Sequence, residues 1–241
     1  MSFCVIAQFK NEAHVISEWL QHYRDEGCSR FYLIDNASTD SYSSLPCMQS
    51  PDIVLSIKPG VHMQEAHYND VFQAYREEMC QYDFVAVVDL DEFLFHPTTS
   101  ISSYLDSMPK SVSQVLIQWS MFGSSGYFQQ PASIFDFTWR KQGLSPLTKA
   151  LVRPKCIAKL KIHSHVTCEG ENVYDTVLQL NHYAIQSYSF FSRIKMTRGS
   201  ANNAVFDKVR NEEYFLLYDF KDYEDLQLQN KRKTFKLEQP Q

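Results

Sequence analysis

Short apolar runs alternate with amphipathic segments along the first half of the chain. The runs are rich in β-branched and aromatic residues, which is typical of buried strands. The predicted strands are 3–9, 30–35, 52–57, 83–89 and 113–119. Apolar residues recur at helical spacing from about Glu12 to a stop at Gly27, over 63–80 and over 101–108. This alternation predicts an α/β fold with a mostly parallel sheet and helices on both faces.

The second half is less regular. A Gly/Ser turn at 122–131 is followed by short apolar segments at 135–140, 149–154 and 155–168, which predict a smaller antiparallel portion. A last helix is predicted over 188–200.

The chain has no internal repeat and no low-complexity linker. We therefore expect one domain over 1–241, with a first half of about 1–120 and a second half of about 121–241.

Three carboxylates end the most apolar strand. Asp89, Asp91 and Glu92 follow the run FVAVV directly, and Leu90 between them can point back into the core. Carboxylates repel one another and lose hydration on burial, so a positive charge should lie beside them. Hard oxygen ligands suit Mg²⁺ or Mn²⁺. A solvated loop that carries acids by chance is the alternative.

A second polar cluster, IDNASTD, follows the strand 30–35. Its Asp35 and Asp40 could accept hydrogen bonds from a nucleoside, or the segment could only form a turn. In parallel sheets ligands bind at the carboxyl ends of the strands, where both acid clusters are expected.

The histidines allow several readings. His163 and His165, with Cys168 beyond them, could form a zinc site, and either of them or His182 could instead complete the Asp site. For each of these histidines, an ordinary role in packing or at the surface is as compatible with the sequence as a ligand role. The chain has neither a GxGxxG nor a GxxxxGK[ST] motif. The candidates to neutralise a diphosphate are Lys149, Arg153, Lys195 and Arg198.

Composition narrows the class of protein. The 241 residues carry a formal net charge of −5, which argues against nucleic acid as a partner. Six scattered cysteines without a CxxC pair predict free thiols in a reducing compartment. No stretch reaches membrane-spanning length. We expect a cytoplasmic protein without stable membrane insertion, located in the host cytoplasm if the chain is viral.

Five motifs, taken in order, resemble a known family. They are FKNEAHVISEWLQHYRDEGCSRFYLIDNASTD, VVDLDEFL, WSMFGSSG, KALVRP and NHYAIQSYSFFSRIKMTRG. The set is similar to glycosyltransferases of the family that includes β-1,4-galactan galactosyltransferases, and to small family 2-like enzymes of bacteria and large DNA viruses. The resemblance implies the GT-A (Rossmann-like) fold, a nucleotide-sugar donor with UDP as the default, a glycan or glycoprotein acceptor, and inversion at the anomeric carbon.

The resemblance also implies roles for individual residues. Asp89 and Asp91 would hold Mn²⁺ or Mg²⁺ against the diphosphate, with His165 or His182 completing the metal site. Asn69 would reach the donor, and Lys195 and Arg198 match a closing basic pair. The residues implied around the nucleoside are Asn11, Glu12, Asp35, Asn36 and Asp40. Gly126-Tyr127 replaces the Gly-His that is frequent in the family, so contacts with the acceptor are expected to differ.

The sequence itself does not identify the catalytic base. Our candidates are Glu92 and Asp136, and Glu92 could instead support a metal ligand. The leading hypothesis is a metal-dependent glycosyltransferase. One alternative is a metal-dependent hydrolase built on His163, His165, Cys168 and an Asp. The other is a non-catalytic module that binds a sugar or nucleotide.

Overall fold

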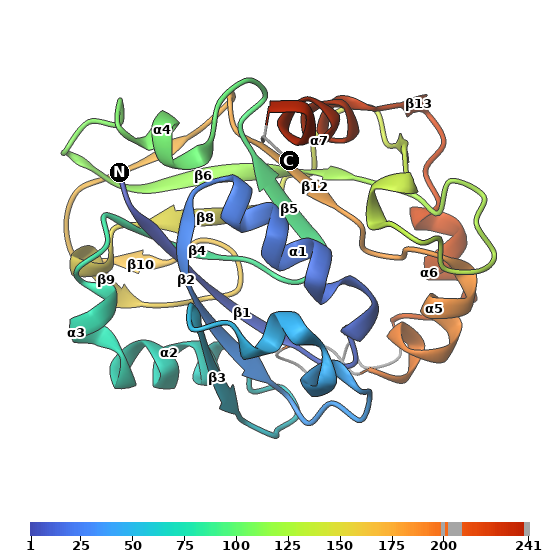
Figure 1. Cartoon of the computed structure of the whole chain (residues 1–241), viewed down its shortest axis with the longest axis horizontal. Coiled ribbons are helices and arrows are strands. Elements are labelled where there is room, and N and C mark those ends of the chain that lie inside the picture. Colours follow the sequence, from blue (N-terminus) through green and yellow to red (C-terminus); the bar gives the residue numbers. More distant parts are fainter. Residues whose placement is uncertain (199–200, 202–208, 239–241) are drawn as a thin grey trace.

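The computed structural model of the chain describes residues 1–198, 201 and 209–238. A central sheet crosses the molecule, with helices packed against it (Figure 1). Its strands are β1 (Phe3–Phe9), β2 (Cys28–Asp35), β3 (Ile53–Ile57), β4 (Phe84–Val87), β5 (Glu92–Phe95), β6 (Val112–Met121), β8 (Thr148–Val152), β11 (Glu171–Tyr174) and β12 (Gln179–His182). The α-helices are α1 (Ala13–Asp25), α2 (Gln64–Ala74), α3 (Arg76–Met79), α4 (Ile101–Leu105), α5 (Tyr188–Arg193), α6 (Glu212–Tyr218) and α7 (Gln227–Glu238).

Two small sheets complete the described structure. One pairs β9 (Ile157–Lys159) with β10 (Val166–Thr167), and the other pairs β7 (Trp139–Arg140) with β13 (Tyr223–Glu224). Short 3-10 helices are η1 (Tyr42–Ser44), η2 (Pro46–Gln49), η3 (Ile134–Asp136), η4 (Pro154–Cys156) and η5 (Lys195–Thr197).

The strand order of the central sheet is β3-β2-β1-β4-β8-β6-β12-β5, and β11 pairs with β6. Strands β3, β2, β1 and β4 are parallel, and so are the pairs β6–β12 and β6–β11. Strand β8 is antiparallel to β4 and β6, and β5 is antiparallel to β12. The sheet is thus largely parallel, which confirms the predicted α/β class. Strands from both halves of the chain share it.

The sequence of β1 explains why helices cover both faces of the sheet. Its side chains alternate between the faces, as strand geometry requires. Val5 packs in the same buried cluster as Trp19 of α1, whereas Ile6 packs in a second cluster with Tyr68 of α2. Both faces of β1 are therefore apolar, and the run FCVIAQF reads as a continuous hydrophobic segment.

Several elements differ from the prediction. The helix predicted over 63–80 is divided at Tyr75 into α2 and α3, and most of 135–140 is 3-10 helix or loop rather than strand. The helix predicted over 188–200 becomes α5 followed by η5, and 199–200 lie outside the described residues. Strands β5, β11 and β12 were not predicted, because β5 follows the acidic turn at once and the other two are rich in polar residues.

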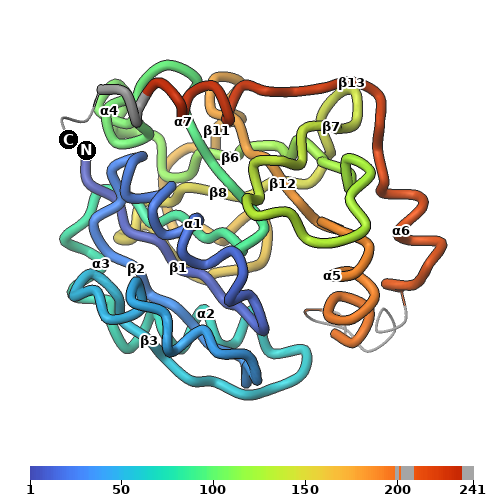
Figure 2. Tube along the Cα trace, turned by 45° about the vertical axis from the view of Figure 1, so that its right-hand side comes forward, coloured from blue at the N-terminus to red at the C-terminus, as the bar shows by residue number. Residues whose placement is uncertain are grey.

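All six cysteines are free thiols, as predicted. Within the part of the chain that the structure describes, no helix combines the length and apolar character needed to cross a membrane. Helices α5 and α6 lie together at one end of the molecule (Figure 2).

Candidate active site

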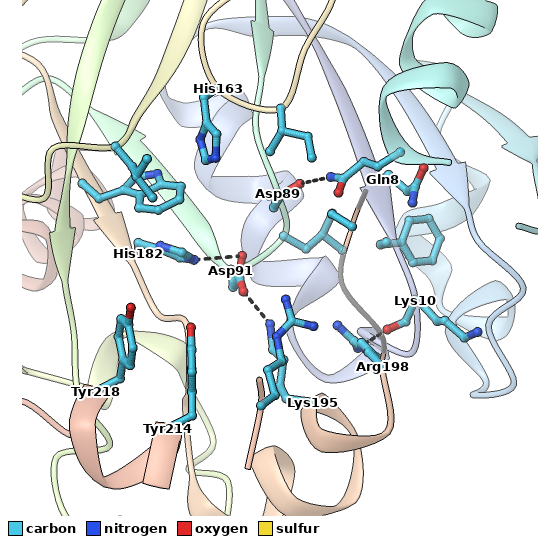
Figure 3. Close-up of a pocket in the computed structure, with 18 of the residues that line it drawn as sticks. Gln8, Lys10, Asp89, Asp91, His163, His182, Lys195, Arg198, Tyr214 and Tyr218 are labelled. Atoms are coloured by element: carbon cyan, nitrogen blue, oxygen red, sulfur yellow. Dashed lines mark hydrogen bonds and ion pairs between the residues drawn. The ribbon is translucent and has the colours of Figure 1, made fainter. Parts of the chain in front are cut away.

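A pocket of about 750 Å³ opens where β1, β4, β6 and β12 end. Both halves of the chain line it: the first contributes the segments after β1 and β4 and the end of β6, and the second contributes the end of β12, η5 and α6 (Figure 3). The charged and imidazole side chains that line it are Lys10, Glu12, His62, Asp89, Asp91, Lys141, His163, His182, Lys195, Arg198 and Arg210. This is the strand-end position at which the sequence placed its acid clusters.

Asp89 is held by three donors. Its Oδ1 accepts hydrogen bonds from Gln64 Nε2 at 2.9 Å and Tyr68 OH at 3.0 Å. Its Oδ2 accepts one from Lys149 Nζ at 2.8 Å. Gln64 and Tyr68 are four residues apart and therefore on one face of α2, which explains why this helix delivers both groups to one carboxylate.

Asp91 lies between His182 and Lys195 (Figure 3). Lys195 Nζ is 2.5 Å from Asp91 Oδ2, and His182 Nε2 is 3.7 Å from Oδ1. Burial alone would raise the pKa of Asp91, but Lys195 and His182 outweigh it and hold the pKa well below its usual range. Asp91 is therefore a carboxylate at every physiological pH.

Glu92 is fully buried, and its Oε2 accepts a hydrogen bond from the Asp89 N–H at 2.9 Å. Lys149 Nζ is 3.4 Å from the same oxygen. Burial raises the pKa of Glu92 to about 7, although Lys149 opposes the shift. Lys149 and Lys195 supply the positive charge that the crowded carboxylates require.

Three groups of the site could hold a divalent metal. Ligand atoms of Asp91, Glu92 and His182 lie within 4.8 Å of one another. Glu92 Oε1 and His182 Nδ1 are buried and have no hydrogen-bond partner among the described residues. Two carboxylates and an imidazole fit Mn²⁺ well and Mg²⁺ less well. Asp89 is not a member of this group and already has hydrogen-bond donors on both oxygens, so of the predicted Asp pair only Asp91 belongs to it.

A second ion-pair group connects the end of β1 to η5. Glu12 is buried, and its Oε1 is 2.6 Å from Arg198 Nη1 and 3.8 Å from Lys195 Nζ. Arg198 Nη2 also donates to the backbone carbonyls of Lys10 and Asn11. The predicted closing basic pair thus reaches the pocket through contacts with residues almost 190 positions earlier.

Other residues predicted around a nucleoside have local structural roles. Asn11 has a positive φ of 54°, and its Oδ1 accepts hydrogen bonds from the N–H groups of Thr39 and Asp40. Asp40 Oδ2 in turn accepts one from the Ala13 N–H at 2.8 Å, at the start of α1. Asn11 and Asp40 border a separate, shallower hollow, not the main pocket.

Asp35 and Asn36 follow β2 but differ in their surroundings. Asp35 Oδ1 accepts a hydrogen bond from the Ser38 N–H, and Oδ2 accepts one from Tyr42 OH, so this carboxylate braces its own turn. Asn36 lines the pocket and its Oδ1 accepts a hydrogen bond from the Gly60 N–H at 3.0 Å. Of the five residues predicted to surround a nucleoside, Glu12 and Asn36 line the pocket.

The structure does not bring Asn69, His165 or Asp136 to the pocket. Asn69 Nδ2 donates to the carbonyls of Glu65 and Leu160, and its Oδ1 accepts the Leu160 N–H, so all its polar atoms join α2 to the segment after β9. Asp136 closes η3. Asn69 and Asp136, predicted as a donor contact and as a base, thus both lie outside the pocket lining.

His165 is buried and is hydrogen-bonded to the backbone. Its Nδ1 accepts a hydrogen bond from the Lys161 N–H at 3.1 Å, and burial lowers its pKa to about 3. It is not part of the Asp91–Glu92–His182 group, so of the two histidines predicted for the metal, only His182 lies there.

His163 does line the pocket, with Nδ1 donating to the Thr148 carbonyl at 3.1 Å. Among the described residues, however, His163, His165 and Cys168 do not form a group with metal-ligand geometry. Arg153 donates to the Val112 carbonyl and stacks on Phe84, outside the pocket. The hydrolase alternative thus lacks its zinc cluster in this part of the chain.

Several residues of the site were not predicted from the sequence. Gln64 and Tyr68 could have been found from their spacing on the predicted helix 63–80. Trp119, Tyr214 and Tyr218 carried no comparable signal, because aromatic residues are abundant here and most of them fill the core.

The pocket lies at the carboxyl ends of the strands, which is where open α/β sheets bind their ligands. The family model for glycosyltransferase family 92 matches residues 58–229, and the chain belongs to this family.

A glycosyltransferase family 92 protein of Ricinus communis is 25% identical over an alignment of 206 residues, which covers 78% of this chain and 36% of that protein. The chain therefore spans about a third of the length of this curated relative.

Solved structures with a similar arrangement include S. aureus TarS residues 1–349, with a TM-score of 0.44, 14% identity, and coverage of 90% of this chain and 71% of that one. Another is glucosyl-3-phosphoglycerate synthase from Mycobacterium tuberculosis in complex with Mn²⁺, UDP and glucosyl-3-phosphoglycerate. It has a TM-score of 0.39, 10% identity, and coverage of 65% of this chain and 58% of that one.

Proposed function

We propose that this chain carries the active site of a metal-dependent, inverting glycosyltransferase that moves a sugar from a UDP-sugar to a hydroxyl of a glycan or glycoprotein. Membership of family 92 supports the reaction class. The observation that carries the proposal is the group of Asp91, Glu92 and His182, of which Asp91 and His182 line a pocket rimmed by lysines and arginines. An acidic floor suits a divalent cation, and a basic rim suits the diphosphate of the donor.

The proposed mechanism follows from the charges that develop as the sugar leaves. Asp91, Glu92 and His182 would hold Mn²⁺ or Mg²⁺, and the ion would supply Lewis-acid stabilisation of the diphosphate leaving group. Lys195 and Arg198 place two further positive charges at the same end of the pocket. Preorganised charges of this kind stabilise a leaving group without reorganisation at the moment of reaction.

Glu92 is assigned to the metal and not to proton transfer. Its carboxyl group is fully buried behind Asp89 and is not part of the pocket lining. A base must reach the acceptor hydroxyl directly or through one water. The raised pKa of Glu92 falls as a cation approaches it, because an adjacent positive charge favours the ionised form.

The finer identity of the substrates rests on the motifs described above. Their likeness to β-1,4-galactan galactosyltransferases makes UDP-galactose the first donor to test and β-1,4-galactotetraose the first acceptor. The organisation as one domain and a cytoplasmic location are also proposals, and the free cysteines support the latter.

The test is the substitution Asp91→Asn, with Asp136→Asn as a matched control outside the pocket. We expect transfer from UDP-galactose to galactotetraose with Mn²⁺, followed by mass spectrometry, to fall by about 10²–10³-fold in Asp91→Asn, because a charge that stabilises the transition state is lost. Calorimetry should show that Mn²⁺-dependent binding of UDP is weakened in the same variant.

Asp136→Asn should leave both measurements unchanged. Normal transfer by Asp91→Asn would refute the metal role. Tight binding of UDP by the unmodified chain, without transfer to any acceptor, would favour a non-catalytic nucleotide-binding module.

A further inference from the structure

The two sides of the pocket differ in chemistry. The side formed by the first half carries polar groups such as Gln8, Lys10, Asn36 and Gln64. The opposite side, which we call the aromatic wall, comprises Trp119, Tyr214, Leu217, Tyr218 and Phe220. A polar side suits a nucleoside diphosphate, so the aromatic wall remains for the other substrate.

The two tyrosines of the wall are held in place by stacking. The rings of Tyr214 and Tyr218 are 4.2 Å apart at an angle of 17°, and Tyr214 also stacks on Phe191 at 5.9 Å and 8°. Their phenol oxygens point towards Asp91 and His182 (Figure 3). Burial raises the pKa of Tyr214 to about 12, so its hydroxyl is a neutral hydrogen-bonding group. Stacking thus aims two hydroxyls at the region where the transferred sugar would lie.

Trp119 adds a hydrogen-bond donor without an acceptor. The indole packs against the imidazoles of His182 at 4.3 Å and His163 at 5.3 Å, and only 8% of Trp119 is exposed. Among the described residues, none accepts a hydrogen bond from the buried Trp119 Nε1. A buried donor without a partner is unfavourable, so a ligand oxygen that accepts this hydrogen bond gains affinity.

Leu217 lies on α6 between the two tyrosines in sequence and is 70% exposed. An apolar side chain that lines a pocket and still faces solvent favours a ligand with an apolar surface. A pyranose ring has such a surface on one face and hydroxyl groups around its edge. Its apolar face matches the Leu217 side chain, and its hydroxyl groups match the three polar hydrogens of the wall.

We propose that the aromatic wall is the acceptor subsite and binds a pyranose unit of a glycan chain, with a sugar oxygen accepting the hydrogen bond from Trp119 Nε1. The inference rests on the proposed function, because it names the acceptor class of the same pocket. It assigns recognition of the acceptor to the end of β6 and to α6, and recognition of the donor to the polar side.

The experiment measures glycan binding without donor. Tetraoses of β-1,4-linked galactose, glucose, mannose and xylose are the probes, followed by saturation-transfer NMR and calorimetry. Trp119→Phe keeps an aromatic ring and removes the N–H, and Trp139→Phe is the same substitution on the exposed strand β7. We expect Trp119→Phe to weaken the best tetraose about tenfold, the effect of one good hydrogen bond, and Trp139→Phe to leave its affinity unchanged.

Tyr218→Phe provides a second, milder variant, because it removes only one hydroxyl; we expect a three- to tenfold loss. Mn²⁺-dependent UDP binding should be equal in all these proteins. Unchanged affinity for the tetraose in both Trp119→Phe and Tyr218→Phe would overturn the subsite.

The subsite and the proposed function can fail separately. Binding of UDP with Mn²⁺ but of no tetraose would overturn the subsite alone. Binding of a tetraose that depends on Trp119, without any binding of nucleotide, would support the wall as a glycan surface and overturn the glycosyltransferase proposal.

Discussion

Lys149 is the residue whose removal best tests the electrostatic account of the site. It belongs to β8, its side chain is 1% exposed, and its Nζ lies 2.8 Å from Asp89 and 3.4 Å from Glu92. Burial alone would lower the pKa of Lys149, but the two carboxylates outweigh it and raise that pKa. The substitution Lys149→Met keeps most of the side-chain volume and deletes the charge.

The expected loss of stability is large because Glu92, one of the two carboxylates that lose their ion-pair partner, has no access to water. Glu92 is 0% exposed, whereas the Asp89 side chain is 27% exposed and partly screened by solvent. Removing one partner of a buried ion pair typically destabilises by about 3–5 kcal/mol, and the partial exposure of Asp89 favours the lower end. For a chain of this size, about 3 kcal/mol corresponds to a fall in Tm of about 6–12 °C.

The loss should also depend on pH. The pKa of Glu92 is raised to about 7 in the folded protein, from an ordinary value of 4.5. The folded state therefore binds this proton more tightly than the unfolded state, so the contribution of Glu92 to stability improves as pH falls from 7 towards 4.5. Without Lys149 the pKa of Glu92 rises further. The loss of unfolding free energy in Lys149→Met should therefore be largest above pH 7 and smaller at pH 5.

Urea denaturation at pH 5 and pH 8 measures both effects. Lys110→Met, on an exposed lysine, is the control and should change stability by less than about 0.5 kcal/mol. The double variant Lys149→Met with Glu92→Gln should recover part of the loss at pH 8, because the buried carboxylate has been neutralised. A loss below about 1 kcal/mol for Lys149→Met, or an equal loss at both pH values, would refute the reasoning.

Two further predictions concern the scaffold. Asn69→Ala should destabilise by about 1–3 kcal/mol without affecting UDP binding, because the Leu160 N–H and two carbonyls lose their partner; calorimetry and urea denaturation check this, with exposed Gln73→Ala as control. Gly27→Ala should destabilise by about 1–3 kcal/mol more than Gly126→Ala. Both glycines have positive φ, but a Cβ at Gly27 would lie 2.1 Å from Ser102 Oγ, whereas Gly126 faces open space. Similar Tm values for the two glycine variants would contradict this.

The local pattern was sufficient for elements whose environment is uniform along their length. Strands β1, β2 and β4 are buried on both faces or nearly so, and their apolar runs identify them. The edge strand β3 is only partly buried, and its apolar run was still sufficient. The local pattern was not sufficient for the helix break at Tyr75 or for the strands β11 and β12. Their backbone conformation depends on which strand or helix lies beside them, and a short polar segment does not carry that information.

The candidate site also has features that follow from the local sequence and features that only the structure shows. The acids after β4 and the need for a nearby cation follow from the sequence, since charge repulsion and loss of hydration are local properties. The resemblance contributed the closing basic pair, and the structure shows that its members contact Asp91 and Glu12. Asn69, Asp136 and His165 were equally plausible in sequence, yet each is positioned for another contact.

The sequence by itself determined that this is an α/β protein with acids at the end of a buried strand, because hydrophobic periodicity and charge density are properties of neighbouring residues. Only the tertiary structure decided that Lys149 and Lys195 neutralise those acids, that His182 joins Asp91 and Glu92, and that α6 supplies the aromatic wall. Those contacts join residues 60 to more than 100 positions apart. They depend on the order of the strands in the sheet, which no local pattern specifies.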